Sequence, residues 1–380
     1  MQFLQDLYTQ SFRPEYRLII AFILAIIVNA YATPVILTIA KAKKIFDIPN
    51  QRGSHKSAVA TLGGLGIYFS IVTVGLSFIN TSGLTRGGSL SSLTSLPAII
   101  AAFTIIFFVG LKDDLLNISP YKKIVAEIIA LLILTMIGEL RLFNLQGIFG
   151  FHEIRFSVSI LLSVFAGVVI INSFNLIDGV DGLASSIAML GCTVFGSYFL
   201  KGGEWEYAIL SFTIVGALIP FFVYNVFGKE NKIFMGDAGS LLLGLAMTAL
   251  VFRFNEMSSV FAFRNHFIAG PALFSFAVLI IPLFDTLRVF AVRIYRGHSP
   301  FAADRRHIHH VLLDLGFTHL QTTLILIVFN LLFIGMAYFL GFLGNSNLVF
   351  SIIIIASIMS GIAMRRNRLK MIAKQKADSE

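Results

Sequence analysis

Long apolar segments alternate with short polar ones along almost the whole chain. A helix that crosses a bilayer needs about 20 apolar residues, with a tolerated range of about 17–25. The alternation predicts eleven such helices, and the period-two pattern of a β-barrel does not appear in the sequence. The predicted membrane segments are 18–40, 62–80, 96–111, 121–140, 157–174, 183–200, 207–227, 239–252, 268–290, 319–341 and 347–364. Since 239–252 is the shortest of them, ten spans are the alternative.

Composition supports a single membrane domain. Hydrophobic residues make up 57% of the 380 and charged residues only 13%, whereas soluble proteins carry about 25% charged residues. We therefore predict an all-α integral membrane protein, a polytopic helical bundle that occupies residues 1–380 as one domain. Its last part, residues 365–380, is a basic tail. The single cysteine, Cys192, excludes an intrachain disulfide and a cysteine-rich metal site.

The basic residues are distributed unequally between the two predicted faces of the membrane. An odd number of spans places the two termini on opposite sides. The side that holds the loop 41–61 and the C-terminal tail carries 21 of the 29 Lys and Arg residues. The positive-inside rule makes that side cytoplasmic, with the N-terminus outside. The net charge of +9 therefore reports orientation, and we expect a lipid bilayer rather than nucleic acid as the partner.

Two pairs of aspartates lie at predicted cytoplasmic ends of helices. Asp113 and Asp114 directly follow an apolar segment, and adjacent carboxylates stay ionised only beside cations or water. Asp178 and Asp181 are three residues apart and would share one face of a helix. Both pairs predict metal coordination or contact with a phosphate-bearing substrate. The alternatives are a solvated helix end for the first pair and a Gly/Asp turn for the second.

Further oxygen ligands accompany these acids. Asn172 and Asn175 repeat the three-residue spacing just before Asp178, and Asp237 lies between two glycines where another apolar segment begins. Carboxylate and amide oxygens without cysteine favour Mg²⁺, with Mn²⁺ as the alternative. The backbone N–H groups at a helix start can also hold a phosphate. For Asp237 alone, an N-cap aspartate is the simpler interpretation.

A histidine cluster lies in the last long cytoplasmic loop. His307, His309 and His310 follow Arg305 and Arg306 in the run RRHIHH. The spacing does not match the HExxH arrangement of zinc enzymes. Imidazoles beside two guanidinium groups predict instead a cradle for phosphates, and the alternative is an ordinary basic loop beside the membrane.

These clusters share one predicted face of the membrane. Carboxylates and amides for a hard cation, basic groups for anions and glycines for close approach are typical of phosphoryl transfer. The apolar surroundings indicate that one substrate is a lipid. The alternative from another class, an ion-coupled transporter, predicts acids near mid-span and inverted repeats, whereas these acids lie at the ends of the segments.

In this order, the sequence holds a DxPxxRxxH pattern at 47–55, a DD pair at 113–114, NxxNxxDGxDGL at 172–183, MGDxGS at 235–240 and HIHH at 307–310. Together they resemble the polyprenyl-phosphate N-acetylhexosamine-1-phosphate transferase superfamily, glycosyltransferase family 4, over about residues 18–341. The branch most similar is the WecA/TagO type, which uses UDP-GlcNAc. The branch that makes lipid I from UDP-MurNAc-pentapeptide has IHHH before Phe-Glu, and it is the alternative within the family.

The resemblance implies a reaction. N-acetylhexosamine-1-phosphate passes from a UDP-sugar, by expectation UDP-GlcNAc, to undecaprenyl phosphate, and UMP leaves. This would be the first membrane step of a cell-envelope glycan, such as O-antigen, lipopolysaccharide or teichoic acid in cell wall biogenesis. It also implies Mg²⁺, a multi-pass location in the bacterial inner membrane with the site facing the cytoplasm, and a homodimer as one assembly to test.

The resemblance also implies roles for individual residues. Asp237 would be the principal Mg²⁺ ligand, with Asn175 as a second ligand or a contact to the diphosphate. Asp178 and Asp181 would be acids near the uridine or the metal. The expected substrate contacts are Asn172, Asn175, Lys122, Arg305, Arg306, His307, His309 and His310.

Asp113, with Asp114 beside it, occupies the position of the general base that is usually proposed for the family. The nucleophile is a phosphate monoester whose second pKa is about 6, so it is mostly a dianion at neutral pH. A carboxylate with an ordinary pKa of about 3.9 adds little as a base. We therefore expect Asp113 mainly to position the nucleophile or a metal.

Overall fold

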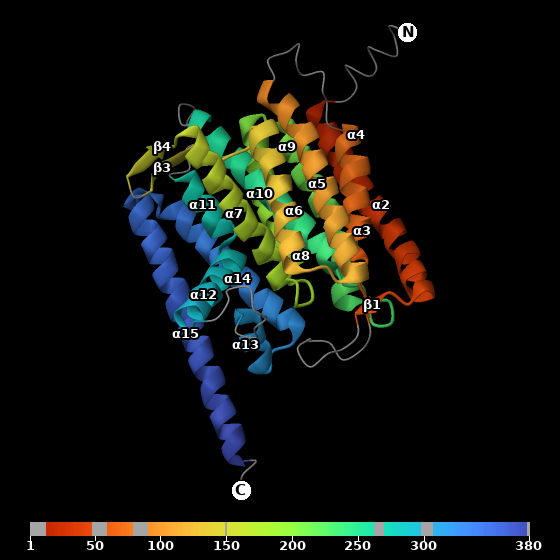
Figure 1. The fold of residues 1–380 in the computed structure, drawn as a ribbon, viewed down its shortest axis with the longest axis vertical. Coiled ribbons are helices and arrows are strands. Elements are labelled where there is room, and N and C mark those ends of the chain that lie inside the picture. The colour runs from red at the N-terminus through yellow and green to blue at the C-terminus, as the bar shows by residue number, and fades with distance from the viewer. Residues whose placement is uncertain are drawn as a thin grey trace.

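A computed structural model describes residues 13–47, 59–78, 90–148, 150–261, 270–297 and 307–377 of the protein. The described chain is a bundle of long, roughly parallel and antiparallel helices with two short hairpins (Figure 1). The prediction of a polytopic, all-α membrane protein is confirmed. Within the residues that the structure describes, eight helices are long and apolar enough to cross a membrane. They are α2 (Pro14–Lys43), α5 (Leu90–Leu116), α7 (Phe156–Ile177), α8 (Leu183–Gly202), α9 (Trp205–Phe227), α10 (Gly236–Phe261), α14 (His319–Phe339) and α15 (Asn345–Ala377).

The other three predicted segments are also helical, but each is interrupted. Segment 268–290 forms α11 (Pro271–Val278) and α12 (Ile280–Tyr295), which meet at a bend of 83° and would make a ninth span if counted as one. In the other two, an α-helix changes to the wider π-helix, a form common at functional sites. These are α3 (Gly63–Ser70), η1 (Ile71–Gly75) and α4 (Leu76–Phe78), then α6 (Pro120–Leu132) and η3 (Ile133–Ile137). The count of eleven spans stays a prediction.

The remaining elements lie at the two ends of the bundle (Figure 1). The strands β1 (Phe46–Asp47) and β2 (Val59–Ala60) pair antiparallel at one end, and β3 (Asn144–Ile148) and β4 (Phe151–Glu153) do so at the other. A short helix, α13 (Ile308–Asp314), lies at the β1 end, and a 3₁₀ turn, η4 (Gly341–Leu343), joins α14 to α15.

The outermost helices turn their large apolar side chains away from the protein. On α2, Ile19, Ile23 and Ile27 are exposed, whereas Ala21 and Ala25 are fully buried. This inversion of the soluble pattern is expected in a bilayer, where small residues let helices approach and lipid covers the large ones. The protein is therefore a multi-pass membrane protein by composition, helix length and surface.

Helix α10 is the centre of the bundle. Its apolar window is 94% buried, compared with 22% for α15 and 28% for α2. Glycines on the neighbouring helices allow this burial. An ideal Cβ on Gly110 of α5 would lie 2.5 Å from the Cα of Ala238, and one on Gly64 of α3 would lie 2.3 Å from the backbone nitrogen of Gly239. Both contacts fall on the first turn of α10, so α3 and α5 fix the start of this helix.

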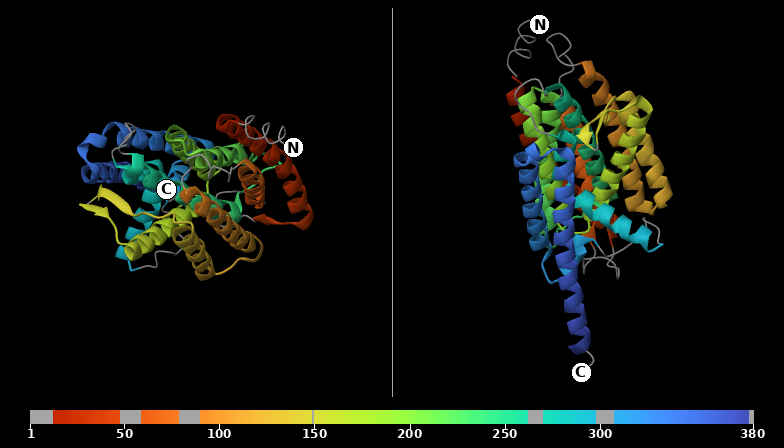
Figure 2. Two further views of the ribbon diagram at one scale, coloured as in Figure 1. Left: turned by 90° about the horizontal axis from the view of Figure 1, so that it is seen from above. Right: turned by 90° about the vertical axis from the view of Figure 1, so that its left-hand side faces the viewer.

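The two ends of the described chain lie at opposite ends of the bundle. Helix α2 begins at the end that carries β3 and β4, and α15 continues past the bundle at the end that carries β1 and α13 (Figures 1 and 2). The acidic motifs lie at the α13 end. This agrees with the prediction that the C-terminal tail and the polar clusters share one side of the membrane. Which end faces the cytoplasm stays a prediction.

Candidate active site

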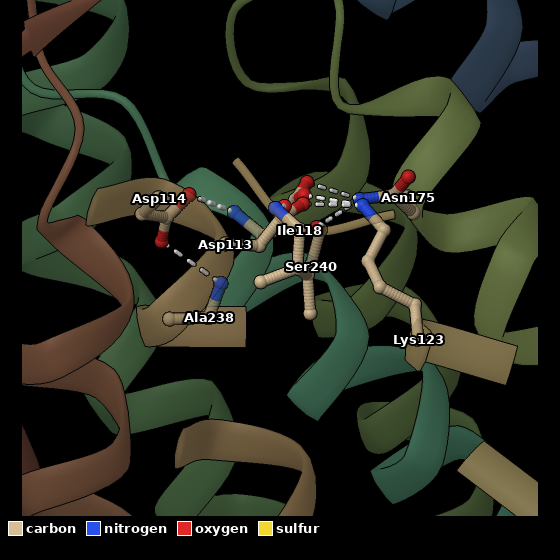
Figure 3. Close-up of polar contacts among 8 residues, drawn as sticks. Asp113, Asp114, Ile118, Lys123, Asn175, Ala238 and Ser240 are labelled. Atoms are coloured by element: carbon tan, nitrogen blue, oxygen red, sulfur yellow. Dashed lines mark hydrogen bonds and ion pairs between the residues drawn. The ribbon is translucent and has the colours of Figure 1, made fainter. Parts of the chain in front are cut away.

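The start of α10 organises the acidic residues. Gly236 has a φ of +71°, and an ideal Cβ there would lie 2.3 Å from the carbonyl oxygen of Thr61 and 2.6 Å from Asp114 Oδ2, so only glycine fits. The Asp114 carboxylate accepts hydrogen bonds from the backbone N–H groups of Asp237 at 2.7 Å and Ala238 at 3.1 Å. Asp114 therefore caps α10 from a neighbouring helix, as Figure 3 shows. The side chain of Asp237 is left for other contacts.

A lysine joins two of the predicted acids. Lys123 Nζ lies 2.5 Å from Asp113 Oδ2 and 2.6 Å from Asp237 Oδ2. Asn175 Nδ2 donates to Asp237 Oδ1 at 2.6 Å and to Ser240 Oγ at 3.0 Å. We call these five residues the acidic cluster (Figure 3). It unites α5, α6, α7 and α10, whose motifs are up to 127 positions apart in the sequence, between Asp113 and Ser240.

The acidic cluster fits a hard divalent cation by the chemistry of its donors. All its candidate ligand atoms are oxygens, from Asp113, Asp237, the amide of Asn175 and the hydroxyl of Ser240, which is the set that Mg²⁺ prefers. A cationic group, the ammonium of Lys123, already lies between the two carboxylates. Within the described part of the chain, no three His, Cys, Asp or Glu side chains form a ready-made metal cage. A metal would therefore share its carboxylates with Lys123.

Asn172 points to a different partner from Asn175. Its Nδ2 donates to Glu127 Oε2 at 2.5 Å, and Glu127 is only 1% exposed. The second carboxylate oxygen, Oε1, is buried without a hydrogen-bond partner among the described residues. Glu127 lies one helical turn after Lys123 on α6, so the two side chains share a face. The sequence predicted Asn172 as a substrate contact, and the structure adds Glu127 as the group that orients it.

The loop of Asp178 and Asp181 is held on both sides. Lys232 Nζ lies 2.6 Å from Asp181 Oδ2, and His319 Nδ1 lies 3.3 Å from the same oxygen. Asn225, which is buried, accepts from the backbone N–H of Gly182 at 2.7 Å and donates to the carbonyl of Ile233 at 2.8 Å. These contacts tie the loop to α9, α14 and the segment before α10. The Asp181 side chain is therefore ion-paired, and the backbone around it is held in place by hydrogen bonds.

Asp178 differs from Asp181. Its carboxyl has no hydrogen-bond or ion-pair partner in the residues that the structure describes. Burial, together with the nearby carboxylates of Asp237 and Asp114, raises the pKa of Asp178 well above its usual range. A partly exposed carboxyl without a partner beside the acidic cluster is typical of a group that meets a ligand.

The raised pKa gives a testable prediction. A group whose pKa rises on folding binds more protons in the folded state, so the free energy of unfolding falls as the pH rises from about 4 to the raised value, by at most about 1.4 kcal/mol per pH unit. We expect Asp178→Asn, which cannot ionise, to equal or exceed the wild-type thermal stability at pH 8 without divalent cations. The difference should shrink toward pH 5. Thermal unfolding of the purified protein from pH 5 to pH 8 measures this, with Glu153→Gln as control, and a variant less stable than wild type at pH 8 would contradict it.

The histidine cluster is organised by a buried acid. Asp285 of α12, 1% exposed, lies 3.1 Å from His307 Nδ1 through Oδ2 and accepts from the backbone N–H of Ile308 at 2.9 Å through Oδ1. Arg288 donates to the same carboxylate at 2.7 Å. Asp285 therefore caps α13 and orients His307. Asp285 is not among the residues predicted from the motifs, although an acid inside the apolar segment 268–290 is a signal for a functional group.

The imidazoles of His309 and His310 lie beside the loop that carries Asp178, and the imidazole of His309 is uncharged. An ideal Cβ on Gly179 would lie 3.7 Å from His309 Nε2 and 4.0 Å from His310 Cε1. Burial, then His310, lowers the pKa of His309 to about 3, so its imidazole is neutral at physiological pH. Both nitrogens of His309 and Nε2 of His307 are buried without hydrogen-bond partners among the described residues. The neutral ring of His309 can offer a ligand one hydrogen-bond donor and one acceptor.

The structure separates two neighbouring lysines and leaves two arginines untested. Lys122, which the sequence selected for substrate binding, is exposed, whereas Lys123 joins the acidic cluster. A substrate contact by Lys122 stays a prediction. Arg305 and Arg306, predicted to hold the diphosphate with the histidines, lie outside the described residues, as does the segment from 48 to 58 with most of the DxPxxRxxH pattern.

Fold and site together define the class of protein. A polytopic membrane protein presents carboxylates, amides, a lysine and buried imidazoles at one end of its bundle, as a membrane enzyme that handles phosphates does. Residues 96–255 match the family model described as glycosyl transferase family 4.

Curated relatives are similar over most of the chain. Decaprenyl-phosphate N-acetylglucosaminephosphotransferase of Mycobacterium tuberculosis (strain H37Rv) is 31% identical over 326 residues, which cover 82% of this chain and 80% of the relative. The protein from Mycobacterium leprae is 29% identical over 82% and 81% of the two chains. Undecaprenyl-phosphate alpha-N-acetylglucosaminyl 1-phosphate transferase of Escherichia coli (strain K12) is 28% identical over 74% and 73%. The chain belongs to glycosyl transferase family 4, as its motifs predicted.

Proposed function

We propose that this protein transfers N-acetylglucosamine-1-phosphate from UDP-GlcNAc to a polyprenyl phosphate, with undecaprenyl phosphate as the expected acceptor. A phosphate oxygen of the acceptor attacks the phosphorus that carries the sugar, the bond to the bridging oxygen breaks and UMP leaves. The product is a polyprenyl-pyrophosphoryl-GlcNAc. The observation that carries the proposal is that relatives named for this transfer with two different polyprenyl phosphates align over about three quarters or more of this chain.

The acidic cluster supports a metal-assisted transfer. We propose that Asp237, Asn175 and Asp113 hold Mg²⁺, or Mn²⁺, which when bound would neutralise charge on the diphosphate. Asp113 already accepts from the backbone N–H of Ile118 at 2.6 Å and from Lys123 at 2.5 Å. A carboxylate held by two donors is oriented and weakly basic, so Asp113 suits positioning better than proton abstraction. Lys123, when released from the carboxylates, can donate to a phosphate oxygen.

We propose that the other polar groups contact the same substrate. The neutral imidazole of His309 can donate to a phosphate oxygen through one of its ring nitrogens, while Asp285 orients His307 through Nδ1. Arg305 and Arg306 are proposed to supply the charge. Asp178 and Asp181 are proposed to lie near the uridine or the metal. The strongly basic end of the bundle favours a cytoplasmic site in a bacterial inner membrane. A homodimer stays a prediction.

One experiment tests the reaction. The purified protein is incubated with Mg²⁺, undecaprenyl phosphate and one UDP-sugar at a time: UDP-GlcNAc, UDP-GalNAc, UDP-glucose or UDP-MurNAc-pentapeptide. We expect UMP release with UDP-GlcNAc and at least about 100-fold less with UDP-glucose, because a site built to bond the acetamido group rejects the sugar that lacks it.

Each alternative has its own result in this assay. Turnover with UDP-MurNAc-pentapeptide alone would assign the protein to the lipid I branch, which the names of the similar relatives do not favour. No UMP with any sugar would overturn the transferase proposal and return the ion-coupled transporter as the hypothesis to test. A decaprenyl phosphate arm tests the acceptor, because the relatives are named for both chain lengths.

A further inference from the structure

An apolar cavity of about 370 Å³ lies between α12, α13, α14 and α15. Its walls are almost entirely hydrocarbon, from side chains such as Phe284, Leu326 and Phe333. Two of its lining residues, Phe317 and Ile362, are 41% and 53% exposed. The cavity is therefore open to the surroundings of the bundle, and in a membrane its contents come from the lipid phase.

The polar groups of the cavity identify the kind of lipid. Arg288 lines it but is engaged, since it donates to Asp285 at 2.7 Å and lies 3.0 Å from the sulfur of Met364. Arg366 also lines the cavity, is exposed, and has no hydrogen-bond or ion-pair partner among the residues that the structure describes. It follows directly on the apolar part of α15, which places it where lipid phosphates lie. An apolar hollow with a cation at its mouth is complementary to an acidic phospholipid.

The acceptor of the proposed reaction places its phosphate away from Arg366. Its phosphate must meet the acidic cluster, and no member of that cluster lines the hollow. A lipid whose phosphate is held at Arg366 is therefore a different molecule from one that reacts beside Asp237. This exclusion rests on the proposed function, whereas the cavity and its arginine do not.

The cavity touches the histidine cluster through two of its lining residues. Asp285 and Ile308 both line it, and they are the carboxylate and the backbone N–H that hold the start of α13 beside His307. Helix α12, which carries Asp285, leans away from the bundle axis after the 83° bend (Figure 2). A chain inside the cavity would fill the space between this leaning helix and α14 and α15.

We propose that this cavity binds one acyl chain of an acidic phospholipid, with the lipid phosphate at Arg366, and that the bound lipid braces α12 against α14 and α15. The site is separate from the acidic cluster. Its ligand is structural, so it is neither consumed nor produced in the reaction.

Lipid retention by the full-length protein tests the proposal without any UDP-sugar. Native mass spectrometry of the detergent-purified protein, titrated with phosphatidylglycerol or phosphatidylcholine, should show preferred retention of the acidic lipid. Arg366→Gln should reduce that retention about five-fold, as expected for one basic residue near a phosphate. Arg365→Gln and Arg368→Gln, exposed neighbours that do not line the cavity, should change it less than two-fold. Ala363→Phe, which fills the cavity, should abolish the bound acidic lipid.

Three results would overturn the proposal. Equal losses in the three arginine variants would show diffuse attraction to the basic end of α15. Full retention in Ala363→Phe would place the lipid elsewhere. One-for-one displacement of phosphatidylglycerol by undecaprenyl phosphate would make the cavity part of the acceptor site, whereas retention at equal concentrations of both supports a separate lipid. A failure of the UMP assay would leave all these arms interpretable, because none depends on turnover.

Discussion

Asp237→Asn is expected to lower the rate of UMP release at least about 1000-fold while the protein stays folded. The Asp237 carboxylate receives Lys123 at 2.6 Å on one oxygen and Asn175 at 2.6 Å on the other. An asparagine keeps the shape of the side chain but has only one acceptor oxygen. Its NH2 group would therefore face either the ammonium of Lys123 or the amide NH2 of Asn175, and that hydrogen bond would be lost. It also removes a full charge from the proposed metal site, and losses of this kind in preorganised sites are about 100- to 1000-fold per group before metal affinity is included.

Single-turnover measurement of UMP at saturating Mg²⁺ checks this prediction, together with thermal unfolding of the same preparation. We expect the free energy of unfolding to fall by only about 1–2 kcal/mol, because one charged hydrogen bond is replaced by a weaker one. The control is Glu153→Gln, which removes an exposed carboxylate on β4 at the opposite end of the bundle. An Asp237→Asn variant within ten-fold of the wild-type rate would remove Asp237 from the centre of the mechanism.

Lys123→Met is expected to have two opposite effects. Turnover should fall at least about 100-fold, because a positioned cation near the transferring phosphate is lost. The affinity for a divalent cation should rise about ten-fold, because in the wild type the metal must displace an ammonium that is paired with both Asp113 and Asp237. A partly buried pair of this kind is worth about 1–2 kcal/mol, and about 1.4 kcal/mol corresponds to ten-fold in affinity.

Binding of Mn²⁺, followed by electron paramagnetic resonance without substrates, measures the second effect independently of catalysis. Added Mg²⁺ should also raise the melting temperature of Lys123→Met more than that of the wild type, since two close carboxylates lack a counter-ion in the variant. Lys122→Met, an exposed neighbour on the same helix, is the matched control and should resemble wild type in metal binding. Unchanged or weaker Mn²⁺ binding in Lys123→Met would show that lysine and metal do not compete.

The sequence motifs predicted a role for Lys122, whereas the structure places its neighbour Lys123 in the acidic cluster. On α6, Ala126, Glu127 and Ala130 are buried. Lys123 lies three, four and seven positions before them, so it belongs to the same face. Lys122 lies on the exposed face with Val125 and Ile129, which are partly exposed to lipid. Small residues mark the inward face of a membrane helix, so this signal was present in the sequence but was not used.

Other site residues carried weaker signals. Asp285 was visible only as one acid in an apolar segment, and its partners, His307 and Ile308, lie more than twenty positions away. Asn225 and His319 brace the Asp178–Asp181 loop from two other helices. Such contacts depend on the rotation and tilt of each helix, and a pattern of polar residues along one chain does not specify these.

The sequence by itself determined the class of the protein, the positions of its helices and the end of the bundle where its chemistry gathers. It could do so because burial in a bilayer constrains every spanning residue and because polar groups there are too costly to occur by chance. Only the tertiary structure decided which oxygens meet one another. It made Asp114 the cap of α10, placed Lys123 between Asp113 and Asp237, and put Asp285 behind the histidines. The physical reason is that these are contacts between helices, and their geometry is set by packing around the buried helix α10.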